Sequence, residues 1–308
     1  MPRMRKNQPE MSDICTSASP LTENDSAGLC TLEEIALWRQ ANNPGVLVGY
    51  RREQNARAAI ASTCACHNET ANVWIHIAAF VWVVFMCFYQ PLVRIPSLPN
   101  TDSYDVLAWM PMLIGAACCF FGSIVCHTFE SSENQKDSIN AAKGDYLGIV
   151  SIMWGGTTCL VCYFFYCSLV WKIVYISILS IICVVVIYLL LDDRFGQPEN
   201  LQKRTVVFGS MWIAVIVPFI HFFVFVKDPE EDKLKFGLLL GGGILLQACG
   251  GFFFSTQWPE SKIKSEWFSW FGSHSMFHVL NSAGVVVLYF ATDYALEYHS
   301  TLTCNKVV

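Results

Sequence analysis

Two histidines one helical turn apart, His274 and His278, are the residues whose spacing first suggests chemistry. A four-residue spacing places both imidazoles on one face of a helix. Ser123 and His127 repeat that spacing, and Asp145 opens another apolar stretch. Three neutral imidazoles with one open coordination position are typical of a catalytic zinc site. The residue types therefore predict a Zn²⁺ site held by His127, His274 and His278.

Asp145 and Ser123 are the candidate catalytic residues beside this metal site. The Asp145 carboxylate is placed to accept a hydrogen bond from a water at the open position, as general base or as an orienting group. The Ser123 hydroxyl is placed to donate to an oxyanion that develops on a substrate. Histidines in membrane proteins more often bond neighbouring helices and stabilise packing. We interpret His76 and His221 in that way, because neither has a partner at ligand spacing.

The elements that must position these residues are membrane-spanning helices. Of the 308 residues, 54% are hydrophobic and only 15% are charged, and seven stretches contain no Asp, Glu, Lys or Arg. These stretches are 73–93, 106–129, 146–171, 173–191, 205–226, 236–258 and 267–292. A helix needs about 20 apolar residues to cross the hydrocarbon core. The sequence therefore predicts an all-α membrane protein with seven transmembrane helices.

The same composition excludes other classes of protein. A soluble globular enzyme, a nucleic-acid binder and a disulfide-stapled secreted domain do not carry so much apolar sequence. Strands of an outer-membrane barrel alternate polar and apolar residues, whereas the stretch 173–191 is apolar on every face. We therefore expect no nucleic acid among the partners.

Counting the crossings places the five candidate residues at one depth. The end of the second span and the starts of the third and seventh spans lie on the same side of the bilayer in either orientation. Of the 20 Lys and Arg residues, 14 fall on the N-terminal side, half of them ahead of the first span. Positive charge favours the cytoplasmic side. The sequence therefore predicts a cytoplasmic N-terminus, a C-terminus outside, and an intramembrane zinc site near the cytoplasmic side.

Three parts follow along the chain: a cytoplasmic tail, a seven-transmembrane domain and a short extracytoplasmic tail, at residues 1–72, 73–293 and 294–308. Within the first part, residues 1–30 are rich in Ser, Thr, Asp and Pro, which is typical of disorder. The spacing of Thr31 and Glu34 is that of a capping box. It predicts a short amphipathic helix near residues 31–41.

Cysteines and glycines leave two alternatives open. Most of the 14 cysteines lie within spans, where a buried thiol behaves as a small apolar residue. The group of Cys64, Cys66 and His67 ahead of the first span fits either metal binding or acylation of the cysteines. The glycines of 241–243 and 250–251 let the sixth span pack closely on a neighbour. That neighbour lies either in the same chain or in a second copy, so a homo-oligomer is one alternative.

Together with the sequence around them, the candidate residues resemble a superfamily of membrane hydrolases. It includes alkaline ceramidases, haemolysin III proteins and the progestin and adipoQ receptor family, and this chain is most similar to the adiponectin-receptor branch of the last. The segments that carry the resemblance are Gly49–Arg51, His67–His76, Asp145–Ile149, Asp193–Phe195, Pro218–Phe222 and Ser273–Leu280. The resemblance runs from about residue 37 to about residue 290.

This resemblance implies a seven-span receptor of lipid metabolism in the plasma membrane or an endomembrane. Its zinc would be held by His127, His274 and His278, with Asp145 and Ser123 beside a zinc-activated water. The implied reaction is cleavage of the amide of a ceramide-like lipid, with Asp145 taking the proton. An extracellular protein ligand is also implied for a receptor, and the sequence does not identify it.

The chain departs from the family pattern outside the five candidate residues. Ser131 and Ser132 stand where receptor members often carry a Cys-His pair. Lys264–Phe268 replaces a Pro-Gly-Lys-Phe-Asp-like run, and Gly144 and Leu147 differ from the usual residues beside the aspartate. These differences bear on which loop partner or ligand is recognised and leave the metal ligands unchanged.

Two alternative functions follow from the same residues. One is a non-catalytic, ligand-sensing receptor in which zinc only ties the second and seventh spans together. The other is metal transport, which is weaker because the far halves of the spans carry few polar side chains beyond Ser, Thr and single amides.

Overall fold

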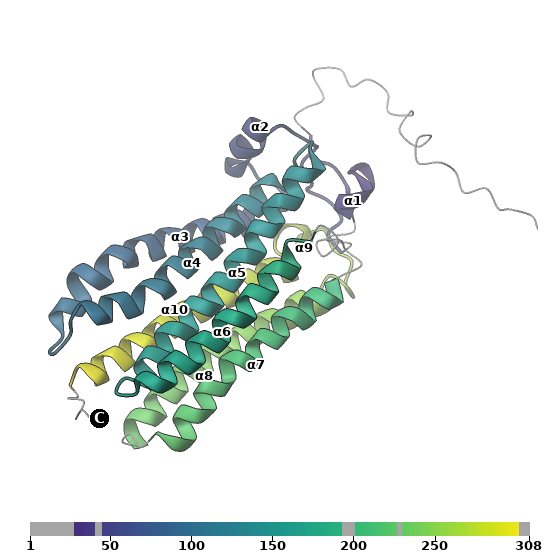
Figure 1. The fold of residues 1–308 in the computed structure, drawn as a ribbon. Helices are drawn as coiled ribbons and strands as arrows, with labels where there is room; N and C mark the ends of the chain where they lie inside the picture. The colour runs from purple at the N-terminus through teal and green to yellow at the C-terminus, as the bar shows by residue number, and fades with distance from the viewer. Residues whose placement is uncertain (1–27, 41–44, 193–200, 227–229, 302–308) are drawn as a thin grey trace, which may run out of the picture.

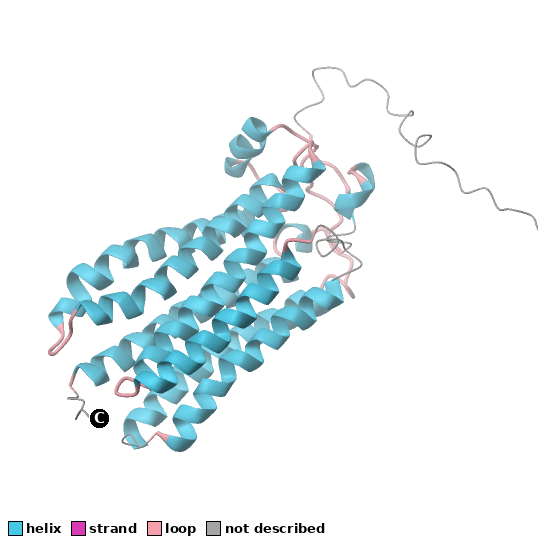
Figure 2. Ribbon diagram, viewed as in Figure 1, coloured by secondary structure: helices cyan, strands magenta, loops and turns pink. Residues whose placement is uncertain are grey.

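The computed structural model describes residues 28–40, 45–192, 201–226 and 230–301. Within them the chain is helical, with isolated β-bridges and no strand (Figure 2). The predicted disorder of residues 1–30 falls almost wholly on residues 1–27, outside the described part, as does the Asp193–Phe195 segment.

In the described part of the chain, seven helical segments are long and apolar enough to cross a membrane, in agreement with the predicted number of spans. They are α3 (Thr70–Tyr89) with its continuation to Ser97, α4 (Ser103–Phe129), α5 (Gln135–Phe164), α6 (Leu169–Leu190), α7 (Leu201–Phe225), α8 (Glu230–Thr256) and α10 (Ser273–Ser300). Two of these helices extend past the charge-free stretches. Helix α5 begins at Gln135 because the Asn134 side chain accepts from the Lys136 N–H, and α10 runs to Ser300, beyond the predicted end at 293.

The N-terminal segment contains short helices rather than one amphipathic helix over 31–41. They are η1 (Leu32–Glu34), α1 (Leu37–Gln40), α2 (Ala56–Ala61) and η2 (Ser62–Cys64). The Glu34 carboxylate accepts a hydrogen bond from the Thr31 N–H at 2.8 Å, so the expected capping contact forms. Helix η1 then stops at Ile35, whose extended backbone lets its side chain bury against Cys30 and Tyr50.

The spans run side by side, with α1 and α2 at one end of the bundle and the C-terminal end of α10 at the other (Figure 1). We call these the N-terminal end and the far end. The α4–α5 connection lies at the N-terminal end, as do the end of α8, α9 (Trp267–Trp270) and the start of α10. Helix α10 contacts α3, α5 and α8, so it links several of the other spans.

Glycines set the close approach of α4 and α5. Gly115 and Gly122 on α4, and Gly148 and Gly155 on α5, are each seven residues apart. A Cβ atom on Gly155 would lie 2.0 Å from the carbonyl oxygen of Pro111. Such contacts are impossible for any larger residue, so the two helices touch backbone to backbone. This contact fixes their register and brings the end of α4 beside the start of α5.

Two of the glycines predicted to pack the sixth span closely, Gly243 and Gly250, do so within this chain. A Cβ on Gly243 would lie 2.7 Å from Leu288 Cγ, and one on Gly250 would lie 2.4 Å from Asn281 Nδ2. Both partners belong to α10. These glycines therefore position the helix that carries two of the candidate metal ligands.

Candidate metal centre

Four imidazoles from three helices meet at the N-terminal end of the bundle. His127 on α4 faces His278 on α10, with their Nε2 atoms 2.9 Å apart. The ring centroid of His274 lies 4.5 Å from that of His278 and 5.3 Å from that of His127. His76 on α3 joins them, with its ring centroid 4.3 Å from that of His278.

The structure thus groups two of the predicted ligands, His127 and His278, with His76, which the sequence assigned to packing, while the third, His274, lies beside this group without belonging to it. The imidazole atoms that come within 4.8 Å of one another belong to His76, His127 and His278. A signal in the sequence was available, because Glu69, Asn72 and His76 are spaced as neighbours on one helix face. Their common face marks α3 as a wall of the site.

Glu69 holds one of the ligands in a fixed orientation. Its Oε2 lies 2.7 Å from His127 Nδ1, so Nδ1 donates and the lone pair of Nε2 points toward His278. Asn72 and Asn68 donate to the two Glu69 oxygens at 2.8 and 3.1 Å. Burial raises the pKa of Glu69, but the hydrogen bonds from His127 and Asn72 lower it, and the pKa stays below its usual range. A carboxylate behind a histidine is the arrangement that orients metal-binding imidazoles.

The wall formed by α3 is also tied to α10. The Ser275 hydroxyl donates to Asn72 Oδ1 at 2.7 Å, and both side chains are buried. Ser275 lies between His274 and His278 in the sequence. This hydrogen bond therefore fixes the two α10 histidines relative to α3.

Arg51, from the Gly49–Arg51 segment, holds the end of α4 in place. Its guanidinium donates to the carbonyl oxygens of His127 at 2.7 Å and Thr128 at 3.1 Å. These carbonyls belong to the last turn of the helix, where backbone acceptors lack partners. Arg39 adds two hydrogen bonds to Glu130, at 3.0 and 2.8 Å. The N-terminal segment is thus fastened beside His127, the candidate metal ligand on α4.

Ser123 and Asp145 meet at the same end of the bundle. The Ser123 hydroxyl donates to Asp145 Oδ1, across the close contact between α4 and α5. Ser123 is buried and Asp145 is half-buried. Because Ser123 precedes His127 by one helical turn, the carboxylate lies about one turn from that ligand. Asp145 Oδ2 accepts no hydrogen bond from the residues that the structure describes.

The cluster fits a divalent cation that prefers imidazole. Tetrahedral zinc, with Zn–N bonds of roughly 2.0–2.1 Å, separates its nitrogen ligands by about 3.3 Å, close to the 2.9 Å between His127 and His278. His76 Nδ1 and Nε2 are both buried and have no hydrogen-bond partner among the described residues. A bound cation is the partner that such nitrogens lack.

The group at Cys64, Cys66 and His67 does not form a second metal cluster around this histidine. Both His67 nitrogens are engaged, since Nδ1 accepts from the Glu69 N–H and Nε2 contacts the Ser62 carbonyl oxygen, each at 3.1 Å. Burial and nearby Arg51 lower the pKa of His67 to about 4. Both thiols are exposed, so their acylation stays a hypothesis.

The structure also shows the surroundings of His221 and of Ser131 and Ser132, which the sequence analysis singled out. His221 Nδ1 lies 2.7 Å from the Tyr175 hydroxyl, and its ring centroid is 4.4 Å from that of Trp171, which agrees with a packing role. Ser131 and Ser132 are buried, and Ser131 Oγ accepts from Gln54 at 2.9 Å. They connect the start of the α4–α5 loop to the N-terminal segment.

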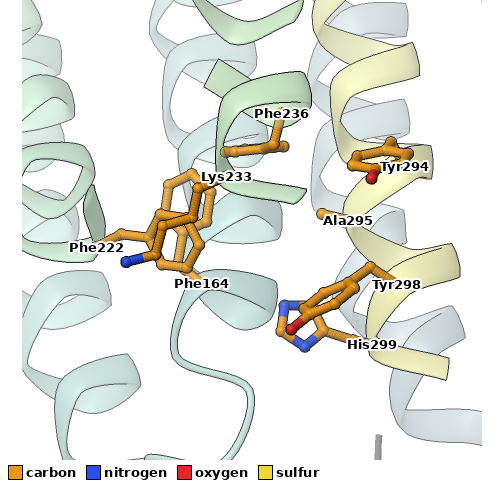
Figure 3. Close-up of a pocket in the computed structure, with 8 residues that line it drawn as sticks. All are labelled: Phe164, Phe222, Lys233, Phe236, Tyr294, Ala295, Tyr298 and His299. Carbon is orange, nitrogen blue, oxygen red and sulfur yellow. The ribbon is translucent and has the colours of Figure 1, made fainter. Parts of the chain in front are cut away.

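Hollows lie at both ends of the bundle. The one at the far end is walled mainly by aromatic rings and carries no set of metal ligands (Figure 3). Its lining residues are Phe164, Phe222, Lys233, Phe236, Tyr294, Ala295, Tyr298 and His299. A smaller hollow at the N-terminal end is lined by Glu69, Asn72, His274 and Ser275, among others. It therefore opens directly beside the histidine cluster.

Comparison with known proteins gives the family context. The sequence profile described as haemolysin-III related matches residues 64–289. The chain is 27% identical to the adiponectin receptor protein of Drosophila melanogaster, over 85% of this chain and 58% of the relative. It is 27% identical to progestin and adipoQ receptor-like protein 1 of Caenorhabditis elegans, over 80% and 55% of the two chains.

A third relative is matched over nearly its whole length. Progestin and adipoQ receptor family member 3 of Mus musculus is 24% identical, over 91% of this chain and 90% of the relative. In contrast, the chain spans less than two thirds of the length of the fly and nematode relatives. The shared region includes the spans that carry the histidine cluster.

Proposed function

The chain belongs to the haemolysin III-related family, as an integral multi-pass membrane protein similar to adiponectin and progestin receptors, and from this premise we propose that it is a receptor-type, zinc-dependent hydrolase of a ceramide-like lipid amide. The observation that carries the proposal is the histidine cluster beside the Asp145 carboxylate within an apolar bundle. The proposal includes the orientation expected from the sequence, with the N-terminus and the metal centre on the cytoplasmic side.

The residues that would hold the ion are His127, His274 and His278. When bound, zinc polarises a carbonyl oxygen and lowers the pKa of water toward 7. Glu69 keeps His127 in the tautomer that presents Nε2. Asn72 and Ser275 keep α3 and α10 in register, so the imidazoles are preorganised before any ligand enters.

Asp145 is the residue proposed to take the proton. Its Oδ1 accepts from Ser123, which leaves Oδ2 to accept a proton from water beside the substrate. The Ser123 hydroxyl proton is therefore already used in a hydrogen bond to the carboxylate. Ser123 orients Asp145 in this state, and its donation to an oxyanion would require that hydrogen bond to be given up.

A lipid is the class of substrate that suits the surroundings of the centre. His274 is half-buried, with the rings of Phe254 and Phe277 each 5.9 Å from its ring centroid. Apolar neighbours of this kind suit an acyl chain. The histidine cluster and Asp145 supply polar groups that would orient an amide.

The proposal is tested on the full chain in lipid nanodiscs loaded with zinc, by measuring metal content and hydrolysis of a fluorescent ceramide. We expect wild-type turnover, and in Asp145→Asn retained zinc with a rate lower by about 10²–10⁴. Asp293→Asn is the matched control, because Asp293 is a partly buried carboxylate at the far end. Zinc-loaded wild type without turnover of ceramide or another lipid amide would refute the hydrolase.

A non-catalytic receptor with structural zinc is the second candidate. The observation that favours it is the fourth imidazole, because structural zinc sites are closed by four protein ligands. This candidate predicts that chelation lowers the thermal midpoint of unfolding of a protein that has no turnover to lose.

A further inference from the structure

We propose that the aromatic hollow at the far end of the bundle is a binding site for a small amphiphile with a singly charged anionic head, such as a carboxylate. The hollow lies at the end of α10 opposite the histidine cluster (Figure 1). The proposal therefore depends neither on the metal nor on the hydrolytic reaction.

Four spans meet around this hollow. Phe164 ends α5, Phe222 lies on the last turn of α7, and Phe236 lies near the start of α8. The last turns of α10 close the other side (Figure 3). The hollow holds about 300 Å³ of space, part of it open to the outside, which is at the small end of the range for ligand sites. It has room for a small molecule or for one end of a lipid.

Three phenylalanine rings form an apolar wall on one side. The ring centroid of Phe164 lies 4.5 Å from that of Phe222, in a stacked arrangement, and 5.1 Å from that of Phe236, edge-on. All three side chains are buried. Rings that pack on one another in this way hold their positions. The wall therefore offers contacts to a hydrocarbon body with little further ordering of side chains.

His299 brings a buried nitrogen without a partner to this hollow. It is 5% exposed, and its Nδ1 forms no hydrogen bond within the described part of the chain. Among the side-chain atoms in that condition, it is the one that belongs to a residue lining the far-end hollow. Stacking on Tyr166, at 5.2 Å between ring centroids, holds the imidazole in place. A buried polar atom without a partner is unfavourable, and a ligand that bonds to Nδ1 would remove this cost.

Lys233 determines the charge of the ligand that fits. Its ammonium donates to the Val226 carbonyl oxygen, which is the hydrogen bond it forms with the residues that the structure describes. An ammonium has three N–H donors, and no carboxylate is among the described residues that line the hollow. An anionic oxygen accepts well from an ammonium and from an imidazole N–H. The lining of Lys233 and His299 beside phenylalanine rings therefore suits an anion on an apolar body.

Free carboxylates and acidic phospholipids share this chemistry, and octanoate is the probe that tests it. Calorimetry measures its binding to the full chain in phosphatidylcholine nanodiscs, with empty nanodiscs as the blank and octanol as the neutral analogue. We expect saturable binding of octanoate, and an affinity for octanol lower by about 10–100-fold. A second arm adds phosphatidylglycerol to the nanodiscs. Weaker octanoate binding there would support the proposal with a phospholipid as the natural source, and unchanged binding would support it with a free carboxylate.

Variants assign the binding to the two polar groups. Lys233→Gln and His299→Phe each remove one donor and should weaken octanoate binding by about 10–100-fold. His299→Asn should recover part of the loss, because its amide nitrogen lies near the place of Nδ1. Lys235→Gln is the matched control. Lys235 follows two residues later on α8, with its Nζ 4.3 Å from the ring centroid of Tyr294, and does not line the hollow, so wild-type affinity should remain.

The wild type alone can overturn the proposal, even if no variant folds. Absence of saturable octanoate binding in phosphatidylcholine nanodiscs would do so, and equal affinities for octanoate and octanol would exclude the anionic head. Unchanged octanoate affinity in both Lys233→Gln and His299→Phe would overturn the assignment to this hollow.

Discussion

The two ends of the bundle both join α3 and α10 by polar contacts, but they differ in their unsatisfied imidazoles. Among the described residues, both nitrogens of His76 lack partners at the N-terminal end, and at the far end His299 Nδ1 alone does. At the far end, Arg94 donates to Asp293 at 2.9 Å and to Glu297 at 2.8 Å. Gln90 donates to Asp293 and accepts from the Tyr289 hydroxyl, at 3.2 and 2.5 Å. The Arg94 guanidinium pairs with two carboxylates there, so the members of this network satisfy one another without a ligand.

The N-terminal end has the same connecting contacts and a surplus of acceptors. Glu69 and Asn72 bond α4 and α10, as the far-end residues bond α10. His76 nevertheless has two nitrogens without partners, and the Nε2 atoms of His127 and His278 face each other. The comparison teaches that a polar network inside a membrane marks a ligand site where its members cannot satisfy one another.

The largest expected effect at the N-terminal end follows from replacing a candidate metal ligand, in His127→Gln. The amide can still donate to Glu69, but it is a poor ligand for zinc, so we expect metal affinity to fall by more than the roughly 10–100-fold typical of outer-shell changes. Metal content after dialysis against a graded chelator measures the loss. His221→Gln, a histidine in another span, should keep full affinity, and equal loss in both variants would contradict the assignment.

A smaller loss of metal affinity is expected when His127 is kept and Glu69, which orients it, is changed. Glu69→Gln keeps the shape of the side chain but removes the charge that orients His127 and strengthens it as a donor. Metal affinity should fall by about 10–100-fold, measured in the same chelator competition. An unchanged affinity would mean that the Glu69–His127 contact is structural only.

At the far end, a change to a polar contact should lower the stability of the protein and leave its metal affinity unchanged. Arg94→Gln removes charged hydrogen bonds to Asp293 and leaves that carboxylate poorly paired, so the free energy of unfolding should fall by about 1–3 kcal/mol. Denaturation in detergent, followed by circular dichroism, gives the difference, and Arg94→Lys should recover part of it. If metal affinity fell with stability in Arg94→Gln, the two ends would not be independent.

The smallest effect concerns His67, a histidine of the N-terminal end whose nitrogens are both satisfied. Its folded pKa of about 4 lies below the ordinary value near 6.5. Its contribution to stability is therefore complete above about pH 6.5 and is lost as pH falls toward 4, because the unfolded chain takes up the proton first. The pH dependence of unfolding in that window should be shallower in His67→Asn than in wild type, by up to about one proton, and identical slopes would count against this assignment.

Much of the site could be predicted from the sequence because helical periodicity and the count of crossings are local properties. The four-residue spacings place His127 with Ser123, and His274 with His278, on single helix faces. Alternation of the spans puts these faces at one end. His76 was missed because its partners belong to other helices. The spacing of Glu69, Asn72 and His76 marks one face of α3, but it does not show which residues of the other helices that face meets.

The fold shows the same division between local and distant information. The seven spans follow from apolar runs, since lipid requires each backbone segment to satisfy its own hydrogen bonds. The helix ends were predicted less well: capping by Asn134 starts α5 well before its apolar stretch. In the N-terminal segment, burial of Ile35 interrupts the expected helix, because a tertiary contact overrides local helix propensity.

The sequence by itself determined that this protein is a bundle of seven membrane-spanning helices with histidines, a serine and an aspartate at one depth, because hydrophobic length and helical spacing are written along each segment. Only the tertiary structure decided which atoms meet: the backbone contact of α4 with α5, the Glu69 carboxylate behind His127, and His76 beside His278. Those pairings depend on how closely helices approach and rotate about one another. That geometry is set jointly by small residues and hydrogen bonds far apart in the chain.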